Sequence, residues 1–432
     1  TAIVIWTTTP WTLVANRAIS VHPRFMYRLV KTPAGELIIV QELIEACMNA
    51  FGYKTGDFEV TDGALAGQEI EKVLCHHPWL DLTVPVILGE HVTKDQGTGS
   101  VHTAPGHGQE DYEVGQRYGL EVYAPVDARG RFTEEAGEFA DQKVFEANKG
   151  IIKLLKDRGM LLKEEPLVHS YPHCWRCKNP VIFRATEQWF ISMEKGQLRR
   201  RAIDEINRVD WIPKWGKDRI LGMIENRPDW CISRQRVWGV PIVAFICLNC
   251  KEPLFSPEIV NHVADMVERE GGSDIWFSKS ADELLPKETA CPKCKKSRFE
   301  KEHDILDVWF ESGVSHAAVL KTRPELAWPA DLYLEGSDQH RGWFHSTLLA
   351  SISTDGRAPY KAVLTHGFVV DGAGKKMSKS AGNVVAPQEV ISQNGAEILR
   401  LWVAATDFRE DVRISPQILS QLIEAYRKIR DT

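Results

Sequence analysis

Three observations predict an α/β protein with more than one domain. Short apolar runs separated by turn residues fill residues 1–165, which is typical of a β-rich domain. Strand-turn-helix patterns follow over residues 166–385, and helical periodicity covers residues 386–432. At 432 residues the chain is too long for one hydrophobic core, so we expect two or three domains.

The composition is that of an ordinary globular protein, with 43% hydrophobic residues, 26% charged residues and a net charge of -6. This mildly acidic total argues against a protein covered by nucleic acid, although local cationic patches can still bind phosphates. No apolar run approaches the roughly 18 residues of a membrane span, and no signal-peptide pattern is present. We therefore expect a cytoplasmic protein that binds no membrane.

In the β-rich part, one helix is expected over residues 143–158, and the strands expected are residues 2–6, 27–30, 36–40 and 84–88. Two polar segments interrupt this pattern, TTTPWTLVAN at 7–16 and GTGSVHTAPGHGQED at 97–111. Together they offer threonine hydroxyls to orient water and an ester, Asp111 to hold an ammonium group, and His102 to limit side-chain size. Taken alone, the first also fits a strand with threonines on its wet face, and the second fits a turn that caps a helix.

Six of the nine cysteines form three C-x-x-C pairs, a spacing that suits metal binding in a reducing compartment better than disulfides. The last two pairs can close a tetrahedral site of four sulfurs, in which structural zinc is expected and free thiols are the alternative. Its ligands would be Cys247, Cys250, Cys291 and Cys294. A helix is expected between these pairs, over residues 256–271. Cys174 and Cys177 supply only two ligands, so we expect that half-site to be empty or incomplete.

Residues 332–344, LYLEGSDQHRGWF, predict a strand end, a tight polar turn and a helix, the kind of junction where ligands bind in open α/β sheets. A second strand over 362–370 leads to GAGKKMSKSAGN at 372–383. Backbone NH groups and lysines of such a flexible loop suit a polyphosphate, although a solvated lysine turn has the same composition. We expect turn and loop to flank one crevice, with a further strand and glycine turn over 304–313 in its wall.

These motifs resemble the class I aminoacyl-tRNA synthetases, and in detail their isoleucine-specific members. The resemblance rests on LEGSDQHRGWF at 334–344 and HGFVVDGAGKKMSKSAGN at 366–383, and it covers nearly the whole chain. It implies that residues 1–165 are a β-barrel-like editing domain and that 166–385 are the C-terminal half of a Rossmann-type catalytic domain. It also implies a zinc-binding insertion at about 245–300 and a helical stem over 386–432.

The resemblance implies ATP-dependent activation of isoleucine and its transfer to tRNA(Ile) by a monomer, with Mg²⁺ accompanying ATP. Lys376 and Lys379 would stabilise the pyrophosphate, and Trp309 and Trp343 would lie near the isoleucine side chain. The residues implied around ATP and the adenylate are Glu335, Gly336, Asp338, Gln339 and Lys379. The residues implied in hydrolytic editing of valyl-tRNA(Ile) are Thr7, Thr8, Thr9, Trp11, Asn16, His102 and Asp111.

The sequence departs from the family pattern in two respects. Val14 stands where proline is usual, and the family's His-x-Gly-His turn is not in the sequence. We therefore expect a fragment, also without the anticodon-binding domain, that does not activate isoleucine alone. A free-standing hydrolase of mischarged tRNA and a zinc-dependent RNA-binding module are the alternatives from other classes. The valine and leucine enzymes fit less well, because they carry an arginine where this chain has Thr9.

Overall fold

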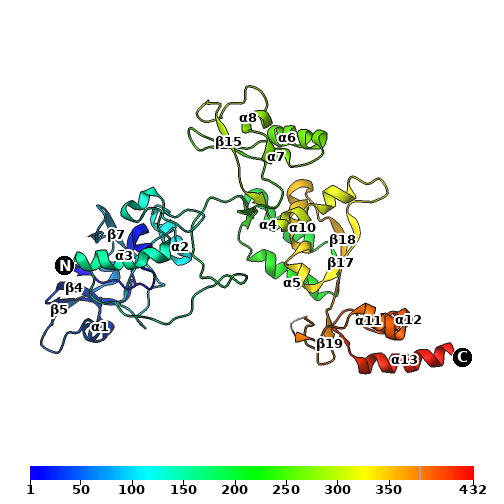
Figure 1. Ribbon diagram of the computed structural model, residues 1–432, viewed down its shortest axis with the longest axis horizontal. Coiled ribbons are helices and arrows are strands. Elements are labelled where there is room, and N and C mark those ends of the chain that lie inside the picture. Colours follow the sequence, from blue (N-terminus) through cyan, green and yellow to red (C-terminus); the bar gives the residue numbers. More distant parts are fainter. Residues whose placement is uncertain (379–380) are drawn as a thin grey trace. The chain divides into compact units, whose positions relative to one another are not determined.

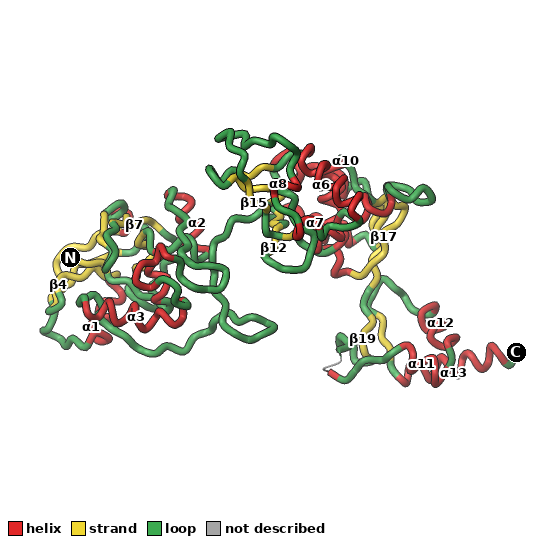
Figure 2. Tube along the Cα trace, turned by 45° about the horizontal axis from the view of Figure 1, so that its top comes forward, coloured by secondary structure: helices red, strands yellow, loops and turns green. Residues whose placement is uncertain are grey.

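The computed structural model describes residues 1–378 and 381–432, and it divides the chain into two units, Thr1–Glu187 and Gln188–Thr432 (Figure 1). Lys379, one of the two lysines expected to act on pyrophosphate, lies outside the described residues. Helices and strands occur in both units (Figure 2), so the predicted α/β class is confirmed. In the described part of the chain, no helix is long and apolar enough to cross a membrane.

The first unit contains two four-stranded sheets. One has the order β1-β4-β3-β5, with strands β1 (Ala2–Ile3), β4 (Gly35–Val40), β3 (Met26–Thr32) and β5 (Glu59–Ala66). The other has the order β6-β7-β2-β8, with strands β6 (Leu74–His76), β7 (Thr83–Leu88), β2 (Ala18–Val21) and β8 (Ser100–Thr103). Antiparallel pairing of β2 with β8 sets Ile19 opposite His102, which fixes the position of that histidine on the sheet.

The helices of the first unit pack their apolar faces against these sheets and loops. They are α1 (Ile44–Phe51), α2 (Gln109–Tyr118), α3 (Val144–Asp157) and the 3₁₀ turns η1 (Pro10–Ala15), η2 (Gln41–Leu43), η3 (Gly67–Glu69) and η4 (Glu134–Phe139). The helix expected over 143–158 is confirmed as α3, whose buried residues recur every three or four positions and pack near Trp11. The alternative of a strand for residues 7–16 is wrong, because Pro10 begins η1, where its missing NH costs nothing. The strand expected over 2–6 ends at Ile3.

Gly67 allows a close approach of two backbone segments in this unit. A Cβ atom at Gly67 would lie 2.1 Å from the carbonyl oxygen of His22, so Gly67→Ala must displace the backbone. We expect this variant to lower the free energy of unfolding by about 1–3 kcal/mol. Urea unfolding measures the change, and Gly63→Ala in β5 is the matched control because a Cβ there meets nothing within 4 Å. Equal stability of the two variants would contradict the prediction.

The second unit is built around a parallel sheet of three strands in the order β10-β18-β17. The strands are β10 (Asp210–Ile212), β18 (Tyr360–His366) and β17 (Ala330–Gly336), and the helices around them are α4 (Leu198–Ile206), α5 (Trp215–Glu225) and α10 (Trp343–Asp355). In Figure 1, β17 and β18 run side by side. The predicted strand, polar turn and helix over 332–344 are confirmed as β17, η7 (Ser337–His340) and α10. Phe344 and Leu348 of α10 are fully buried in the core of this unit.

Two predicted strands of the second unit are wrong in part. The strand expected over 362–370 breaks at Gly367, where a Cβ would lie 2.1 Å from the carbonyl oxygen of Glu410. The chain continues as β19 (Val369–Asp371), which pairs with β20 (Val412–Ile414) instead of the main sheet. Only Ile305–Leu306 of the strand expected over 304–313 forms, as β16, because α9 (Val308–Gly313) begins directly after Asp307.

Shorter elements complete the second unit. Strand β9 (Phe190–Ile191) pairs with β11 (Trp230–Cys231), and β12 (Ser233–Arg234) pairs with β16. The cysteine-rich part contains the sheet β14-β13-β15 and a small core, with β14 (Pro253–Leu254), β13 (Phe245–Cys247), β15 (Phe299–Lys301), α6 (Pro257–Glu270), α7 (Ile275–Ser278) and α8 (Ala281–Leu284). The helix expected over 256–271 is confirmed as α6, and Ser256 caps it. The expected C-terminal helices are α11 (Pro387–Asn394), α12 (Ala396–Ala404) and α13 (Pro416–Arg430).

Candidate functional site

The two polar segments of the first unit meet at a pocket of about 270 Å³. Five of the seven residues implied in editing line it, namely Thr7, Thr8, Thr9, His102 and Asp111. Trp11 is buried in the core instead, with its ring edge-on to Phe132. Asn16 is also buried, and its Oδ1 accepts a hydrogen bond from the NH of Ala18 at 3.3 Å. The pocket also contains Thr12, His91 and His107, to which sequence reasoning gave no role.

Threonine hydroxyls form a connected chain along one wall of the pocket. The NH of Thr9 donates to Thr7 Oγ1 at 3.0 Å, and Thr12 Oγ1 donates to the carbonyl of Thr9 at 2.8 Å. Thr12 Oγ1 also lies 3.0 Å from His102 Nε2. Because the Thr12 proton points to the carbonyl, its oxygen accepts from His102, which places the imidazole proton on Nε2. His102 Nδ1 therefore carries a lone pair, and it has no hydrogen-bond partner among the described residues.

Asp111 stands in the first turn of α2, where its Oδ2 accepts from the NH of Ala104 at 2.8 Å. Burial raises the pKa of this carboxyl, while the Ala104 hydrogen bond and nearby His91 partly offset that effect. A cation that entered the pocket would favour the charged carboxylate. The arrangement is therefore suited to bind an ammonium group next to a row of hydroxyls.

Burial of His102 makes the stability of the first unit depend on pH. Burial, assisted by His77 and His107, lowers the pKa of His102 from 6.5 to about 4. Between pH 6.5 and about pH 4, the unfolded chain binds a proton at this histidine and the folded chain does not. The free energy of unfolding therefore decreases as the pH is lowered through this range. The expected loss is about 3 kcal/mol. Urea unfolding at several pH values should show that the free energy of unfolding depends less on pH in His102→Gln than in the wild type. An equal pH dependence of the two proteins would contradict this.

The residues implied around the adenylate lie at the C-terminal end of β17. Glu335 and Asp338 are exposed there. Gln339 holds the turn, because its Oε1 accepts from the NH of Trp343 at 2.8 Å and its Nε2 donates to Asp338 Oδ2 at 3.2 Å. A Cβ at Gly336 would lie 2.9 Å from Asp338 Oδ1, so a larger residue there would require this exposed side chain to move. Ligands of parallel sheets bind at this end of the strands.

The two tryptophans implied near isoleucine have different surroundings. Trp309 is 44% exposed and lines a second pocket of about 300 Å³, next to Gly342. Trp343 stacks on Tyr333 with ring centroids 4.2 Å apart, and its Nε1 donates to the carbonyl of Ser312 at 3.1 Å. Trp343 is therefore held by packing, whereas Trp309 is available to a ligand.

The lysine loop, GAGKKMSKSAGN at 372–383, is held at its base by Asp371. Its Oδ1 accepts from the NH groups of Ala373 and Lys375 at 3.0 and 2.8 Å, and its Oδ2 accepts from Asn383 Nδ2 at 2.9 Å. The amide of Asn383 and these NH groups lower the pKa of Asp371. Lys376 is exposed on this loop. Whether the loop and the turn after β17 flank one crevice stays a prediction.

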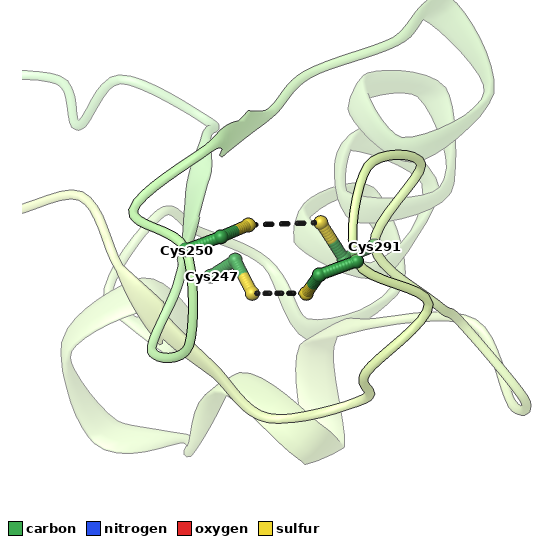
Figure 3. Close-up of side chains that lie close together, drawn as sticks. Cys247, Cys250 and Cys291 are labelled. Carbon is green, nitrogen blue, oxygen red and sulfur yellow. Dashed lines mark hydrogen bonds between the residues drawn. The ribbon is translucent and has the colours of Figure 1, made fainter.

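The four cysteines of the last two C-x-x-C pairs come together (Figure 3). Their sulfur atoms all lie within 4.8 Å of one another, with Cys247 to Cys294 at 3.5 Å and Cys250 to Cys291 at 3.6 Å. A tetrahedral zinc site with Zn–S bonds of about 2.3 Å requires sulfur separations of about 3.8 Å, so the donors fit this ion. Burial raises the pKa of Cys247, but the backbone NH groups of Cys250 and Asn249 and the neighbouring thiols lower it to about 7.

The first C-x-x-C pair forms the same local turn as the other two. In each turn the lysine after the second cysteine has a positive φ, at Lys178, Lys251 and Lys295. The NH of Cys174 donates to the carbonyl of Asn179, as Cys291 does to Lys296, both at 2.8 Å. Within the described residues, metal-compatible groups of three or more ligands occur at the four-cysteine cluster and nowhere else.

The family model for class I tRNA synthetases specific for I, L, M and V matches residues 10–415. The chain therefore belongs to the class I tRNA synthetases, which confirms the resemblance seen in its motifs.

The curated relatives are more specific. The isoleucine–tRNA ligase of Geobacter sulfurreducens is 60% identical over 431 residues, covering 100% of this chain and 46% of that protein. The isoleucine–tRNA ligase of Syntrophotalea carbinolica is 58% identical with the same coverage. The chain thus spans about half the length of these relatives, at 46%. A solved complex of Agrobacterium radiobacter K84 agnB2 LeuRS, tRNA and LeuAMS matches 98% of this chain and 45% of its own chain, at 17% identity and a TM-score of 0.36.

Proposed function

We propose that this chain is part of an isoleucine–tRNA ligase that charges tRNA(Ile) and hydrolyses valyl-tRNA(Ile) in its first unit. The observation that carries the hydrolytic part is the pocket in which Asp111, threonine hydroxyls and the neutral His102 converge. The names of relatives at 58–60% identity support the synthetic part. In this proposal residues 1–165 edit, 166–385 form half of the catalytic domain, and 386–432 lead to the anticodon-binding domain.

A second site for hydrolysis has a physical reason. A pocket that accepts isoleucine gains only about 1–3 kcal/mol over valine from one methylene, and the isoleucine enzyme is the usual illustration of this limit. In the editing pocket, Asp111 would bind the α-ammonium group while Thr7, Thr8 and Thr9 orient water and the ester. The buried ring of His102 would then limit the size of the side chain that enters.

The second unit would contribute to adenylate formation. Glu335, Gly336, Asp338 and Gln339 would surround the adenylate at the end of β17, Trp309 would contact isoleucine, and ATP would bind with Mg²⁺. Lys376, with Lys379, would stabilise the charge on pyrophosphate as it leaves. The four-cysteine cluster would hold a structural Zn²⁺, since four sulfur ligands leave no open position for water.

Hydrolysis by the chain itself tests the proposal. The purified chain, incubated without ATP, should release valine from valyl-tRNA(Ile) much faster than isoleucine from isoleucyl-tRNA(Ile). Acid-precipitable label on each tRNA measures both rates. Release of neither amino acid would refute the hydrolytic function, and equal release of both would refute its selectivity.

The lysine loop is tested in the longer ligase. Replacing Lys376 with alanine should slow ATP–pyrophosphate exchange about 10²-fold, because a charged donor to the leaving group is lost. Lys375→Ala is the matched control, since Lys375 is the neighbouring exposed lysine of the same loop. Exchange at an unchanged rate in the Lys376 variant would remove this side chain from the site.

A further inference from the structure

His107 is a buried histidine of the editing pocket whose Nε2 has no hydrogen-bond partner among the described residues. The residue is only 8% exposed and lines the pocket, and its ring lies edge-on to Trp11 with centroids 4.7 Å apart. Its Nδ1 is 3.0 Å from the carbonyl oxygen of Phe183. Because a carbonyl has no proton to give, Nδ1 must carry the proton and Nε2 must carry the lone pair. In the described part of the chain, this buried Nε2 has no hydrogen-bond partner.

The carbonyl that orients His107 is itself held in place. The NH of Ala185 donates to the carbonyl of Gly106 at 2.8 Å, so residues 183–185 run against residues 106–107. Arg184 Nη1 donates to the carbonyl of Val126 at 3.3 Å. A Cβ at Gly106 would lie 2.2 Å from another backbone oxygen, so this segment is closely packed on its other side as well. The imidazole is therefore fixed both in orientation and in tautomer.

We propose that His107 is a further catalytic residue of the hydrolysis and acts as its general base through Nε2. This inference rests on the proposed function of the pocket. Nε2 takes a proton from water while the water oxygen forms a bond to the ester carbonyl carbon. As the tetrahedral intermediate collapses, the bond from that carbon to the terminal ribose oxygen breaks and the imidazolium returns the proton to this oxygen. The products are the free amino acid and the tRNA hydroxyl, and His107 is neutral again.

His107 is better suited to this step than His102. The pKa of His102 is lowered to about 4, which makes it a weak base. Burial also lowers the pKa of His107, but the carbonyl of Phe183 raises it by stabilising the imidazolium, while Arg184 lowers it. In this arrangement His107 is the base, and the carbonyl of Phe183 orients it as the carboxylate of a catalytic triad orients its histidine. The other titratable groups lining the pocket are His102, His91 and Asp111.

Kinetics of the chain on valyl-tRNA(Ile) test the inference. His107→Gln should lower kcat by about 10²-fold or more and leave KM within about threefold, because glutamine accepts a hydrogen bond but transfers no proton. The wild-type chain should lose activity with unit slope at acid pH, and the variant should lack this limb. His22→Gln is the control, because His22 is a buried histidine of the same unit that does not line the pocket and stacks on Phe25.

The outcomes separate this inference from the proposed function. An active wild type with a His107→Gln variant of equal kcat and an intact acid limb would overturn the role of His107 alone. A wild type that releases no valine would overturn the proposed function and the inference with it. If circular dichroism shows that the variant does not fold, the solvent deuterium isotope effect on wild-type kcat tests the inference instead. A value of about 2 supports proton transfer to a base in the rate-limiting step, as proposed for His107, and a value near 1 contradicts such a transfer.

Discussion

Replacing Asp111 with alanine is expected to reduce kcat/KM for valyl-tRNA(Ile) hydrolysis by about 10²- to 10³-fold. Asp111 is partly buried in the pocket wall, and one carboxylate oxygen already accepts from the NH of Ala104. Removing the carboxylate would leave the substrate ammonium group without a counter-charge in a desolvated site, at a cost of about 2–5 kcal/mol. Single-turnover deacylation with excess protein measures the loss.

Two further variants separate charge from structure at this position. Asp111→Asn keeps an oxygen for the NH of Ala104 and removes only the charge, so it should lose nearly as much activity as alanine. Glu110→Ala removes a neighbouring exposed acid and should hydrolyse normally. Full activity in Asp111→Asn would mean that the side chain only holds the NH of Ala104, and full activity in both Asp111 variants would remove it from the site.

Removing zinc is expected to unfold the cysteine-rich part of the second unit. Cys247 and Cys291 belong to the same small core as Trp276, so the metal would join the two halves of that core. Structural zinc sites contribute about 10–16 kcal/mol, as much as a whole domain's net stability of about 5–15 kcal/mol. A strong chelator should therefore shift part of the chain's tryptophan fluorescence to the red, since Trp276 is 3% exposed when folded.

Metal analysis gives the direct measurement. The chain should contain one zinc ion, and Cys291→Ser should lose it. Cys174→Ser is the control, because Cys174 forms the same kind of turn but lies outside the four-sulfur cluster. A metal-free chain with four titratable thiols at the cluster would contradict the zinc assignment.

The sequence pattern correctly predicted the elements that depend only on residues close together in the chain. The helix α3 differs from its expected span by one residue at each end, because its apolar spacing and its packing face coincide. The strand expected over 362–370 failed because its break depends on contact between Gly367 and Glu410, which are far apart in the sequence. A glycine in an apolar run gives no sign of which distant backbone approaches it.

The same distinction applies to the candidate site. In the 3₁₀ helix η1, residues three apart share a face, so Thr12 lies near Thr9 at the pocket while Trp11 points to the core. A strand interpretation gives the opposite assignment. His107 belongs to the polar segment expected at the pocket, but its role could not be assigned from the sequence, because the carbonyl of Phe183 that orients it is a backbone group without a sequence signal. The matched C-x-x-C spacing predicted that the last two turns pair, and the structure brings their four sulfur atoms together.

Strand β17 is one of the two outer strands of its sheet, and in the described residues it pairs with β18 on one side only. Its unpaired NH and carbonyl groups lie beside Leu332 and Leu334, which are 44% and 52% exposed. Such an edge is a template for a strand from another molecule. Concentrated solutions of the purified chain should therefore aggregate through this edge, and a lysine in place of Leu334 should improve solubility.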